Sequence, residues 1–333
     1  MIVSRTPLRI SLAGGGSDIP AWYREHGGAV LSSAIDKYVF VAVRRRFDDQ
    51  VRAGYTLTEI VPSREALQHE LMREAMLSAG VERGIEIVTI ADVPAQGTGL
   101  GSSSSVTVGL LHALYRYAGI EATAEEIARE ACAIEIERLG KPIGKQDQYI
   151  AAYGGLRVTR FHRDGAVTTT PVAITAEAYA RLDRSLMLFY TGITRSASTV
   201  LGDTAFGSEA NAEYLGRIVA LVQETADALG RGDVDAVGAI LHEGWELKHS
   251  LGDGISSPEI DALYAAARAA GATGGKIAGA GGGGFLLLAV PEAAQARVRA
   301  AMGARLRELP FHLVPHGSEI VLDLPYEEAE AHA

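Results

Sequence analysis

The segment Pro94–Ser105, which reads PAQGTGLGSSSS, constrains this chain more than any other stretch of its sequence. Glycines at positions 97, 99 and 101 leave backbone N–H groups accessible to a ligand, because no side chain stands in front of them. Four serines then lead into the apolar run Val106–Leu114. Serine favours a helix start, where free N–H groups and the helix dipole attract anions. The segment therefore predicts a phosphate-binding loop followed by a helix.

Two other interpretations of this segment are weaker. A Gly/Ser-rich surface loop is one, but the abrupt change from glycines to an apolar helix argues against it. A Walker loop is the other, but its pattern GxxxxGK[ST] needs a lysine that this segment lacks.

Glycine also dominates one segment near the start of the chain and one near its end. Pro7–Asp18 reads PLRISLAGGGSD, and its alternating Leu8, Ile10 and Leu12 predict a strand that ends at a glycine triplet. Lys276–Leu288 reads KIAGAGGGGFLLL and formally contains the dinucleotide-binding pattern GxGxxG. That pattern normally follows a strand and opens a helix, whereas here a predicted helix precedes the glycines and a strand follows them. The reversed order argues against a dinucleotide fold.

Composition excludes several classes of partner. The net charge of −10 and the pI of about 5.4 argue against binding to nucleic acid or to an anionic membrane. The single cysteine, Cys132, cannot form an internal disulfide and suits a reducing compartment. No apolar run of about 18 residues and no signal-peptide pattern occurs, so we expect a cytoplasmic protein.

The order of the predicted elements favours the α+β class. The predicted strands cover residues 8–12, 39–45, 86–90, 154–161, 186–190, 285–290 and 319–324. The predicted helices cover residues 123–139, 207–249 with turn points at Gly230 and Gly232, 258–270 and 292–307. Strands and helices mix irregularly rather than as repeated βαβ units. The length suggests about two domains, with a boundary between Ala173 and Arg184.

The three glycine-rich segments, in this order, resemble the three signature motifs of the GHMP kinases, the family of galactokinase, homoserine kinase, mevalonate kinase and phosphomevalonate kinase. Within it, the runs AGGGSD, HGGAVLSSAIDKY, GKQDQYIAAYGGL and YTGITRSAS are most similar to members that phosphorylate heptose phosphates. The resemblance extends from Ile2 to Leu324. It implies a ribosomal protein S5 domain 2-like domain over residues 1–178, a ferredoxin-like domain over residues 179–333, and an active site between them.

The resemblance also implies which residues bind ATP. The loop and helix start would bind its phosphates through Gly97, Gly99, Leu100, Gly101, Ser102, Ser103 and Ser104. The third glycine-rich segment would close over the nucleotide through Gly281 and Gly282.

The geometry of the predicted helix places the carboxylate of Glu135 on a buried face. A capping box formed by Thr123 and Glu126 predicts a helix start. At about 100° per residue, Glu135 then lies opposite Glu126, within the apolar stripe of the helix. A buried carboxylate needs a partner, which either an ion pair with Arg138 or a Mg²⁺ ion would supply.

The resemblance favours the metal. The family's metal-binding glutamate stands five residues before a Gly-x-Pro-x-Gly run, which here is Gly140–Gly144. This spacing selects Glu135 over Glu137. The resemblance implies a hydroxyl of the phosphate loop as the second metal ligand, best matched by Ser103.

Asp147, in the run GKQDQY, matches the family's catalytic aspartate, and Arg9 matches the arginine that flanks it in galactokinase-like members. Such an aspartate orients the acceptor hydroxyl and accepts its proton. The charge of Arg9 would keep Asp147 ionised and stabilise the transferring phosphoryl group. Arg9 lies on the strand face opposite Leu8 and Ile10, so we do not expect it in the core. Without the family match, Asp147 would be interpreted as a turn residue.

The expected substrate-binding residues are Gly15, Gly16, Asp18, Lys145, Gly192 and Arg195. Asp18 matches the aspartate that holds sugar hydroxyls. Galactokinases carry Glu-His where this chain has Gly15-Gly16, which argues against galactose and for a bulkier sugar.

A phosphorylated acceptor also needs cations. Lys37, Lys145 and Arg195 are the candidates, whereas Arg44–Arg46 reads as a solvated charge run. Arg195 is the first choice, because it lies in a Gly/Ser/Thr-rich run and arginine binds phosphate through a fork.

These expectations describe a sugar kinase that uses ATP and Mg²⁺ to convert D-glycero-D-manno-heptose 7-phosphate into the 1,7-bisphosphate, towards nucleotide-activated heptose for surface polysaccharide. The alternatives are another anomeric sugar kinase, acting on L-fucose or galactose, and a catalytically silent sensor of sugar or nucleotide. The intact set of Arg9, Ser103, Glu135 and Asp147 favours an enzyme. The sequence leaves the oligomeric state open, a homo-oligomer included.

Overall fold

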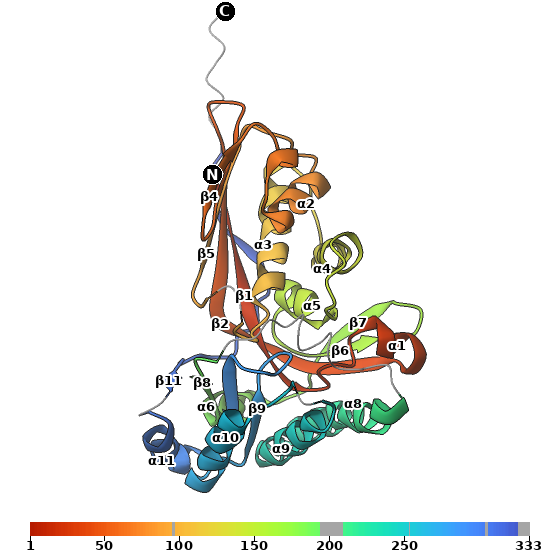
Figure 1. Cartoon of the computed structure of the whole chain (residues 1–333), viewed down its shortest axis with the longest axis vertical. Helices are drawn as coiled ribbons and strands as arrows, with labels where there is room; N and C mark the ends of the chain where they lie inside the picture. The colour runs from red at the N-terminus through yellow and green to blue at the C-terminus, as the bar shows by residue number, and fades with distance from the viewer. Residues whose placement is uncertain (95–96, 194–208, 253, 304–305, 326–333) are drawn as a thin grey trace, which may run out of the picture.

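The computed structural model describes residues 1–94, 97–193, 209–252, 254–303 and 306–325. The chain forms two β-sheets, each with helices packed against it (Figure 1). This mixture of sheets and helices confirms the predicted α+β class.

The first sheet contains eight strands. They are β1 (Ile2–Ala13), β2 (Gly28–Arg45), β3 (Val51–Gly54), β4 (Thr58–Val61), β5 (Ile85–Ala91), β6 (Leu156–Phe161), β7 (Val167–Pro171) and β12 (Glu319–Asp323). The main order is β12-β1-β2-β5-β3-β4, and only the pair of β3 with β5 is parallel. The first part of β2 pairs with β6 and its last part pairs with β5. The sheet therefore has two branches that share β2.

Helices cover one face of this sheet (Figure 1). They are α2 (Glu70–Ser78), α3 (Ser102–Tyr117), α4 (Ala124–Cys132), the π-helix η2 (Ala133–Arg138) and α5 (Gln146–Tyr153). The shorter elements are α1 (Pro20–His26) and the 3-10 turn η1 (Arg64–Ala66). The predicted capping box at the start of α4 is present. The predicted helix over residues 123–139 is wrong in one respect, because it is π-helical from Ala133 onward.

The second sheet has the order β11-β8-β10-β9. Its strands are β8 (Leu186–Tyr190), β9 (Gly274–Ile277), β10 (Phe285–Ala289) and β11 (Arg307–Glu308). The helices that accompany it are α6 (Ala176–Ser185), α8 (Glu209–Gly230), α9 (Asp235–His249), α10 (Pro258–Ala270) and α11 (Glu292–Met302). The break between α8 and α9 falls at the predicted turn points, whereas α11 is shorter than predicted, because Arg307 already belongs to a strand.

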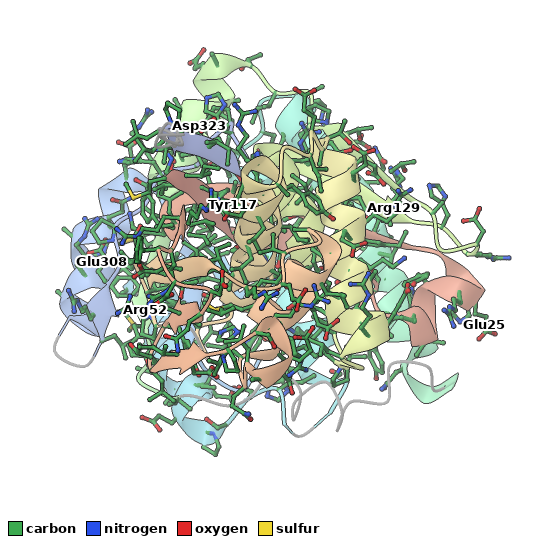
Figure 2. All side chains as sticks on the ribbon, turned by 90° about the horizontal axis from the view of Figure 1, so that it is seen from above. Glu25, Arg52, Tyr117, Arg129, Glu308 and Asp323 are labelled. Atoms are coloured by element: carbon green, nitrogen blue, oxygen red, sulfur yellow. The ribbon has the colours of Figure 1, made fainter. Side chains whose placement is uncertain are left out.

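The chain crosses from one sheet to the other between Pro171 and Leu186, and β12 brings it back to the first sheet beside β1. A domain division at residue 178 stays a prediction. Seen from above, side chains fill the space between the sheet and its helices, and the exposed Glu25 lies at the edge of the molecule (Figure 2). None of the helices in the described part of the chain is long and apolar enough to cross a bilayer.

Gly109 allows α3 to lie very close to the first sheet. A Cβ atom built on it would lie 2.9 Å from Thr6 Oγ1 and 3.1 Å from Val41 Cγ2. The hydroxyl of Ser4 donates to the Gly109 carbonyl oxygen at 2.8 Å. The helix that carries the phosphate loop is thus fixed directly against β1 and β2.

We expect Gly109→Ala to lower the free energy of unfolding by about 1–3 kcal/mol, because the added methyl group overpacks this contact although alanine is the better helix former. Gly216→Ala in α8 is the matched control, since no described atom beyond the adjoining backbone of its own helix lies within 4 Å of its Cβ position. The control should stabilise the protein by about 0.5–1 kcal/mol. Urea unfolding of both variants measures the difference, and equal stabilisation would contradict the close contact.

Candidate active site

Two of the glycine-rich segments are in backbone contact where the sheets adjoin. A Cβ atom built on Gly99 would lie 2.3 Å from the carbonyl oxygen of Ala278, and one built on Gly279 would lie 2.6 Å from Gly99 Cα. The N–H of Phe285 donates to the Thr98 carbonyl oxygen at 3.2 Å. Gly99 also has a φ of 73°, which other residues rarely adopt. The structure therefore brings together the two segments that were predicted to bind ATP.

The four serines at the start of α3 differ in their surroundings. Three of them are buried: Ser102, Ser104 and Ser105. Ser103 is exposed, and its hydroxyl donates to Glu135 Oε1 at 3.1 Å. The side chain of Leu100 is fully buried, so only its backbone is available to a phosphate. Gly97 and Gly101 have positive φ and, like Gly99, present backbone without a side chain.

The third glycine-rich segment is partly engaged within the protein. The N–H of Gly282 donates to the Ile255 carbonyl oxygen at 2.8 Å. A Cβ atom on Gly281 would lie 2.9 Å from the same oxygen. The binding of ATP by Gly281 and Gly282 stays a prediction.

Glu135 lies in η2 and its side chain has no exposed surface. Oε2 accepts from Gln148 Nε2 at 2.7 Å, and the nearest cation is Lys141, whose Nζ lies 3.8 Å from Oε1. Burial raises the pKa of Glu135, and Lys141 acts in the opposite direction. The alternative ion pair with Arg138 does not form, because that guanidinium binds Glu130 at 2.6 Å. The predicted burial of Glu135 is confirmed, and Glu137 is exposed as expected.

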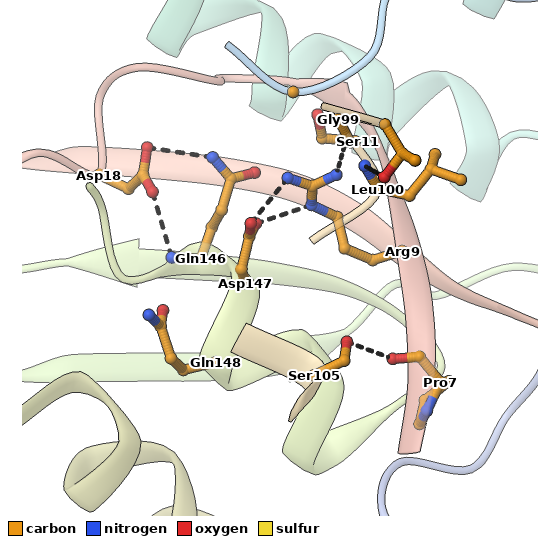
Figure 3. A network of polar contacts seen from close by, with 12 residues as sticks. Pro7, Arg9, Ser11, Asp18, Gly99, Leu100, Ser105, Gln146, Asp147 and Gln148 are labelled. Atoms are coloured by element: carbon orange, nitrogen blue, oxygen red, sulfur yellow. Dashed lines mark hydrogen bonds and ion pairs between the residues drawn. The ribbon is translucent and has the colours of Figure 1, made fainter. Parts of the chain in front are cut away.

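Arg9 and Asp147 form a doubly hydrogen-bonded ion pair (Figure 3). Arg9 Nε lies 2.7 Å from Asp147 Oδ1, and Nη2 lies 2.9 Å from Oδ2. Nη1 donates to the carbonyl oxygen of Gly99, which ties the pair to the phosphate loop. The Arg9 side chain is 4% exposed and that of Asp147 is 22% exposed, so the aspartate is the more accessible partner. The expectation that Arg9 lies outside the core is wrong, because the paired carboxylate and the loop carbonyl allow the guanidinium to be buried.

Asp18 binds the segment that carries Asp147 (Figure 3). Its Oδ2 accepts from the backbone N–H of Gln146 and its Oδ1 from Gln146 Nε2, both at 3.1 Å. Gly144 makes this approach possible, because a Cβ atom there would lie 1.9 Å from Asp18 Oδ2. Burial, followed by the charge of Asp147, raises the pKa of Asp18. Its predicted contact with sugar hydroxyls stays a prediction.

Sequence comparison extends this picture to the whole chain. The family profile described as GHMP kinases N terminal domain matches residues 65–155, and the one described as GHMP kinases C terminal matches residues 225–308. A D-glycero-alpha-D-manno-heptose 7-phosphate kinase of Campylobacter jejuni is 31% identical over 306 residues, which cover 87% of this chain and 89% of that protein. The chain belongs to the GHMP kinases.

Other relatives agree with this membership. The crystal structure of a D-glycero-D-manno-heptose 1-phosphate kinase from Bacteroides thetaiotaomicron superimposes with a TM-score of 0.82 and 26% identity, covering 98% of this chain and 100% of that chain. A bifunctional fucokinase/GDP-fucose pyrophosphorylase of Arabidopsis thaliana is 26% identical over 87% of this chain and 30% of its own length. This GHMP kinase is therefore an ATP-dependent phosphotransferase with the two-domain fold of its family.

The cations predicted to hold an acceptor phosphate are dispersed in this GHMP kinase. Lys37 Nζ pairs with Asp36 at 2.8 Å. Lys145 Nζ donates to the Gly165 carbonyl oxygen at 2.8 Å and lies 5.2 Å from the centre of the Tyr23 ring. Near Arg44–Arg46, Arg44 and Arg46 pair with Glu86 and Asp48, as a surface charge run would. No atom of the described residues lies within 4 Å of the Cβ position of Gly192, beyond its own chain neighbours, whereas Arg195 lies outside the described residues.

The sequence analysis missed two lysines that the structure buries beside the first glycine-rich segment. Lys248 is 6% exposed and Lys276 is 7% exposed. Local sequence patterns do not indicate their burial, and the sequence offers only the hint that lysine is uncommon, since five of the 31 lysines and arginines are lysines.

Proposed function

We propose that this GHMP kinase transfers the γ-phosphoryl group of ATP to the anomeric hydroxyl of D-glycero-D-manno-heptose 7-phosphate, giving the 1,7-bisphosphate and ADP. The observation that carries the proposal is the doubly hydrogen-bonded pair of Arg9 and Asp147, located where the glycine-rich segments meet. Similarity to a heptose 7-phosphate kinase across 87% of the chain supports the choice of acceptor.

In the proposed reaction, the anomeric oxygen attacks the γ-phosphorus, a new P–O bond forms, and the bond to the ADP oxygen breaks. The proton of the hydroxyl passes to the carboxylate of Asp147 and then to solvent. Arg9 holds that carboxylate through two hydrogen bonds and so fixes its direction. Phosphoryl transfer needs little else from a protein beyond positioning and charge stabilisation.

The donor phosphates have a matching site at the start of α3. The backbone of the loop at Gly97, Gly99 and Gly101 is free of side chains, and the first turn of the helix offers N–H groups and the positive end of its dipole. Gly281 and Gly282 would close over the nucleotide from the second sheet.

The residues around Glu135 fit a Mg²⁺ ion. A buried carboxylate with an exposed hydroxyl, Ser103, beside it supplies the hard oxygen donors that this ion prefers. No group of three or more His, Cys, Asp or Glu side chains suited to a metal occurs in the described ranges, but Mg²⁺ bound to phosphates needs only one or two protein ligands. When bound, Mg²⁺ neutralises negative charge on the transferring phosphates.

The acceptor would lie at the first glycine-rich turn. Gly15 and Gly16 leave room for a seven-carbon sugar, and Asp18 is adjacent. Arg195, Lys145 and Gly192 remain proposed contacts of the acceptor. We further propose a cytoplasmic location, which the single, unpaired Cys132 supports.

A second candidate is an anomeric kinase of another sugar, favoured by the similarity to the fucokinase of Arabidopsis thaliana over 87% of this chain. A silent sensor has less support, because a chain without catalysis has no need of the buried Arg9–Asp147 pair at the end of the phosphate loop.

We expect Asp147→Asn to lower kcat by about 10²–10⁴-fold, because an amide cannot accept the proton of the hydroxyl. ATP binding should survive, since the donor loop is untouched. Asp227→Asn, at an exposed position of α8, is the matched control. Steady-state kinetics with a direct measurement of the ATP Kd tests this, and near-normal turnover would remove Asp147 from the mechanism.

Glu135→Gln should weaken Mg²⁺-dependent nucleotide binding, whereas Glu137→Gln, the exposed control, should not. Burial raises the pKa of Glu135, so protons should compete with the metal, and the Mg²⁺ requirement of the wild-type protein should increase as the pH falls. Titrating Mg²⁺ at fixed ATP over a pH series measures both effects. Equal behaviour of the two variants would exclude Glu135 as a ligand.

The kcat/KM for heptose 7-phosphate should exceed that for unphosphorylated heptose by about 10²–10⁴-fold, which corresponds to two charge-assisted contacts. A coupled assay of ADP release with both heptoses, L-fucose and galactose measures the preference, and NMR of the product locates the new phosphate. If the free sugars react as well as the phosphosugar, only the second candidate function stands.

A further inference from the structure

Two buried lysines face the first glycine-rich turn from the side of the second sheet. Lys276 lies in β9, and its Nζ donates to the hydroxyl of Ser11 at 3.0 Å. Lys248 lies in the last turn of α9, and its Nζ donates to the carbonyl oxygen of Gly279. Both hydrogen-bond partners are neutral. Among the described residues, no carboxylate pairs with either ammonium within 4.0 Å.

Such an arrangement is unfavourable without an anion. A buried charge normally has a counter-ion, because desolvation is expensive. Burial is the main reason why the pKa of Lys248 is lowered to about 8, followed by the charge of Arg9. Burial, then the charges of Lys248 and Arg9, lowers the pKa of Lys276 well below the ordinary value of a lysine. The negative charge of Asp18 acts in the opposite direction and raises the pKa of both lysines.

Among the described residues, no charged side chain other than these two lysines lines the cavity. The cavity that both lysines line is about 20 Å³, and α8 contributes only the apolar Ile218 and Leu221 to it. Asp147 acts on Asp18 and pairs with Arg9. The pair of lysines therefore has a surplus of positive charge around it.

The choice of lysine is itself informative. Arginine supplies most cations of this chain, and its guanidinium stays charged in any protein environment. Lysine can release its proton when it is buried without an anion and regain it when an anion arrives. Two of the five lysines of the chain lie at this turn, where a side chain that gains its proton when an anion binds would be useful.

Gly15 leaves space beside the ammonium group of Lys276. Gly14 and Gly16 have positive φ, of 87° and 97°, but Gly15 does not, so its backbone conformation does not require glycine. A Cβ atom built on it would lie 4.0 Å from both Lys276 Nζ and Ser11 Oγ. Gly15 is also partly exposed, whereas the cavity behind it holds little more than a water molecule. An anion would therefore lie at Gly15 rather than inside the cavity.

We propose that Lys248 and Lys276 bind the phosphate group of the acceptor sugar beside Gly15. This inference rests on the proposed function and deepens it. A phosphate dianion matches two ammonium groups, and the donor phosphates are already assigned to the start of α3, with Glu135 and Ser103 as the proposed ligands of a Mg²⁺ ion. Binding of the dianion restores the charge of the lysines, so it takes up protons from solution.

The test compares Lys248→Met and Lys276→Met with Arg181→Met, an exposed cation of α6 whose partner is Asp235. Replacing a buried cation with an apolar side chain of similar length should not impair folding. Each of the two variants should lose about 10- to 100-fold in kcat/KM for heptose 7-phosphate, little for unphosphorylated heptose, and none in ATP affinity. Gly15→Val, which keeps both lysines but fills the space, should show the same selective loss.

Calorimetry supplies a readout that does not depend on turnover. Above pH 8, binding of heptose 7-phosphate in buffers of different ionisation enthalpy should show proton uptake by the wild-type protein and less by each lysine variant. Equal losses with both sugars, weaker ATP binding, or unchanged proton uptake would overturn the inference.

The same experiment separates the inference from the proposed function. If wild-type protein prefers the phosphosugar and the lysine variants keep that preference, the proposed function stands and this site is wrong. If wild-type protein shows no preference, the proposed acceptor is wrong. Inorganic phosphate then serves as the probe, and its binding must be lost in both lysine variants for the anion site to stand.

Discussion

The side chain of Arg9 forms hydrogen bonds to two segments of the chain, and the backbone of Arg9 forms a third hydrogen bond. The guanidinium group donates to Asp147 in α5 and to the carbonyl oxygen of Gly99, and the backbone N–H of Arg9 donates to the Leu100 carbonyl oxygen at 3.1 Å. Because the side chain is 4% exposed, loss of any partner would leave a buried donor unsatisfied. The positions of β1, of the glycine-rich loop at Gly99 and of Asp147 are therefore coupled through one side chain.

Local patterns in the sequence predicted much of this architecture. Alternating Leu8, Ile10 and Leu12 predicted the end of β1, the Thr123–Glu126 capping box predicted the start of α4, and the glycine-rich segments predicted the loops. These features depend on neighbours within a few residues. Burial of Arg9 was not predictable in this way, because its counter-ion lies 138 residues away in the chain. The two lysines at the first glycine-rich turn were missed for the same reason, since their surroundings are created by packing between sheets.

Glu135 shows how a correct prediction can rest on an incomplete geometry. The expected position used an α-helical rotation per residue, but the residues from Ala133 to Arg138 are π-helical. The wider turn changes the direction of each following side chain, and such segments often occur at functional sites. Sequence periodicity does not reveal a change of helix type. In the structure, the hydrogen bonds of Glu135 with Ser103 and Gln148 define the direction of its side chain, because they require this carboxylate to face α3 and α5.

The return of β12 to the first sheet has a consequence for how the protein is made. Its neighbour β1 leaves the ribosome long before β12 does, and the backbone amine of Met1 donates to the carbonyl oxygen of Leu324 at 2.7 Å. Synthesis of nearly the whole chain thus separates the two partners, and pairings so distant in sequence form slowly. One edge of β1 stays open during translation, and an open strand edge is a template for association with other chains. The emerging protein therefore depends on β12 to cover the open edge of the strand that carries Arg9.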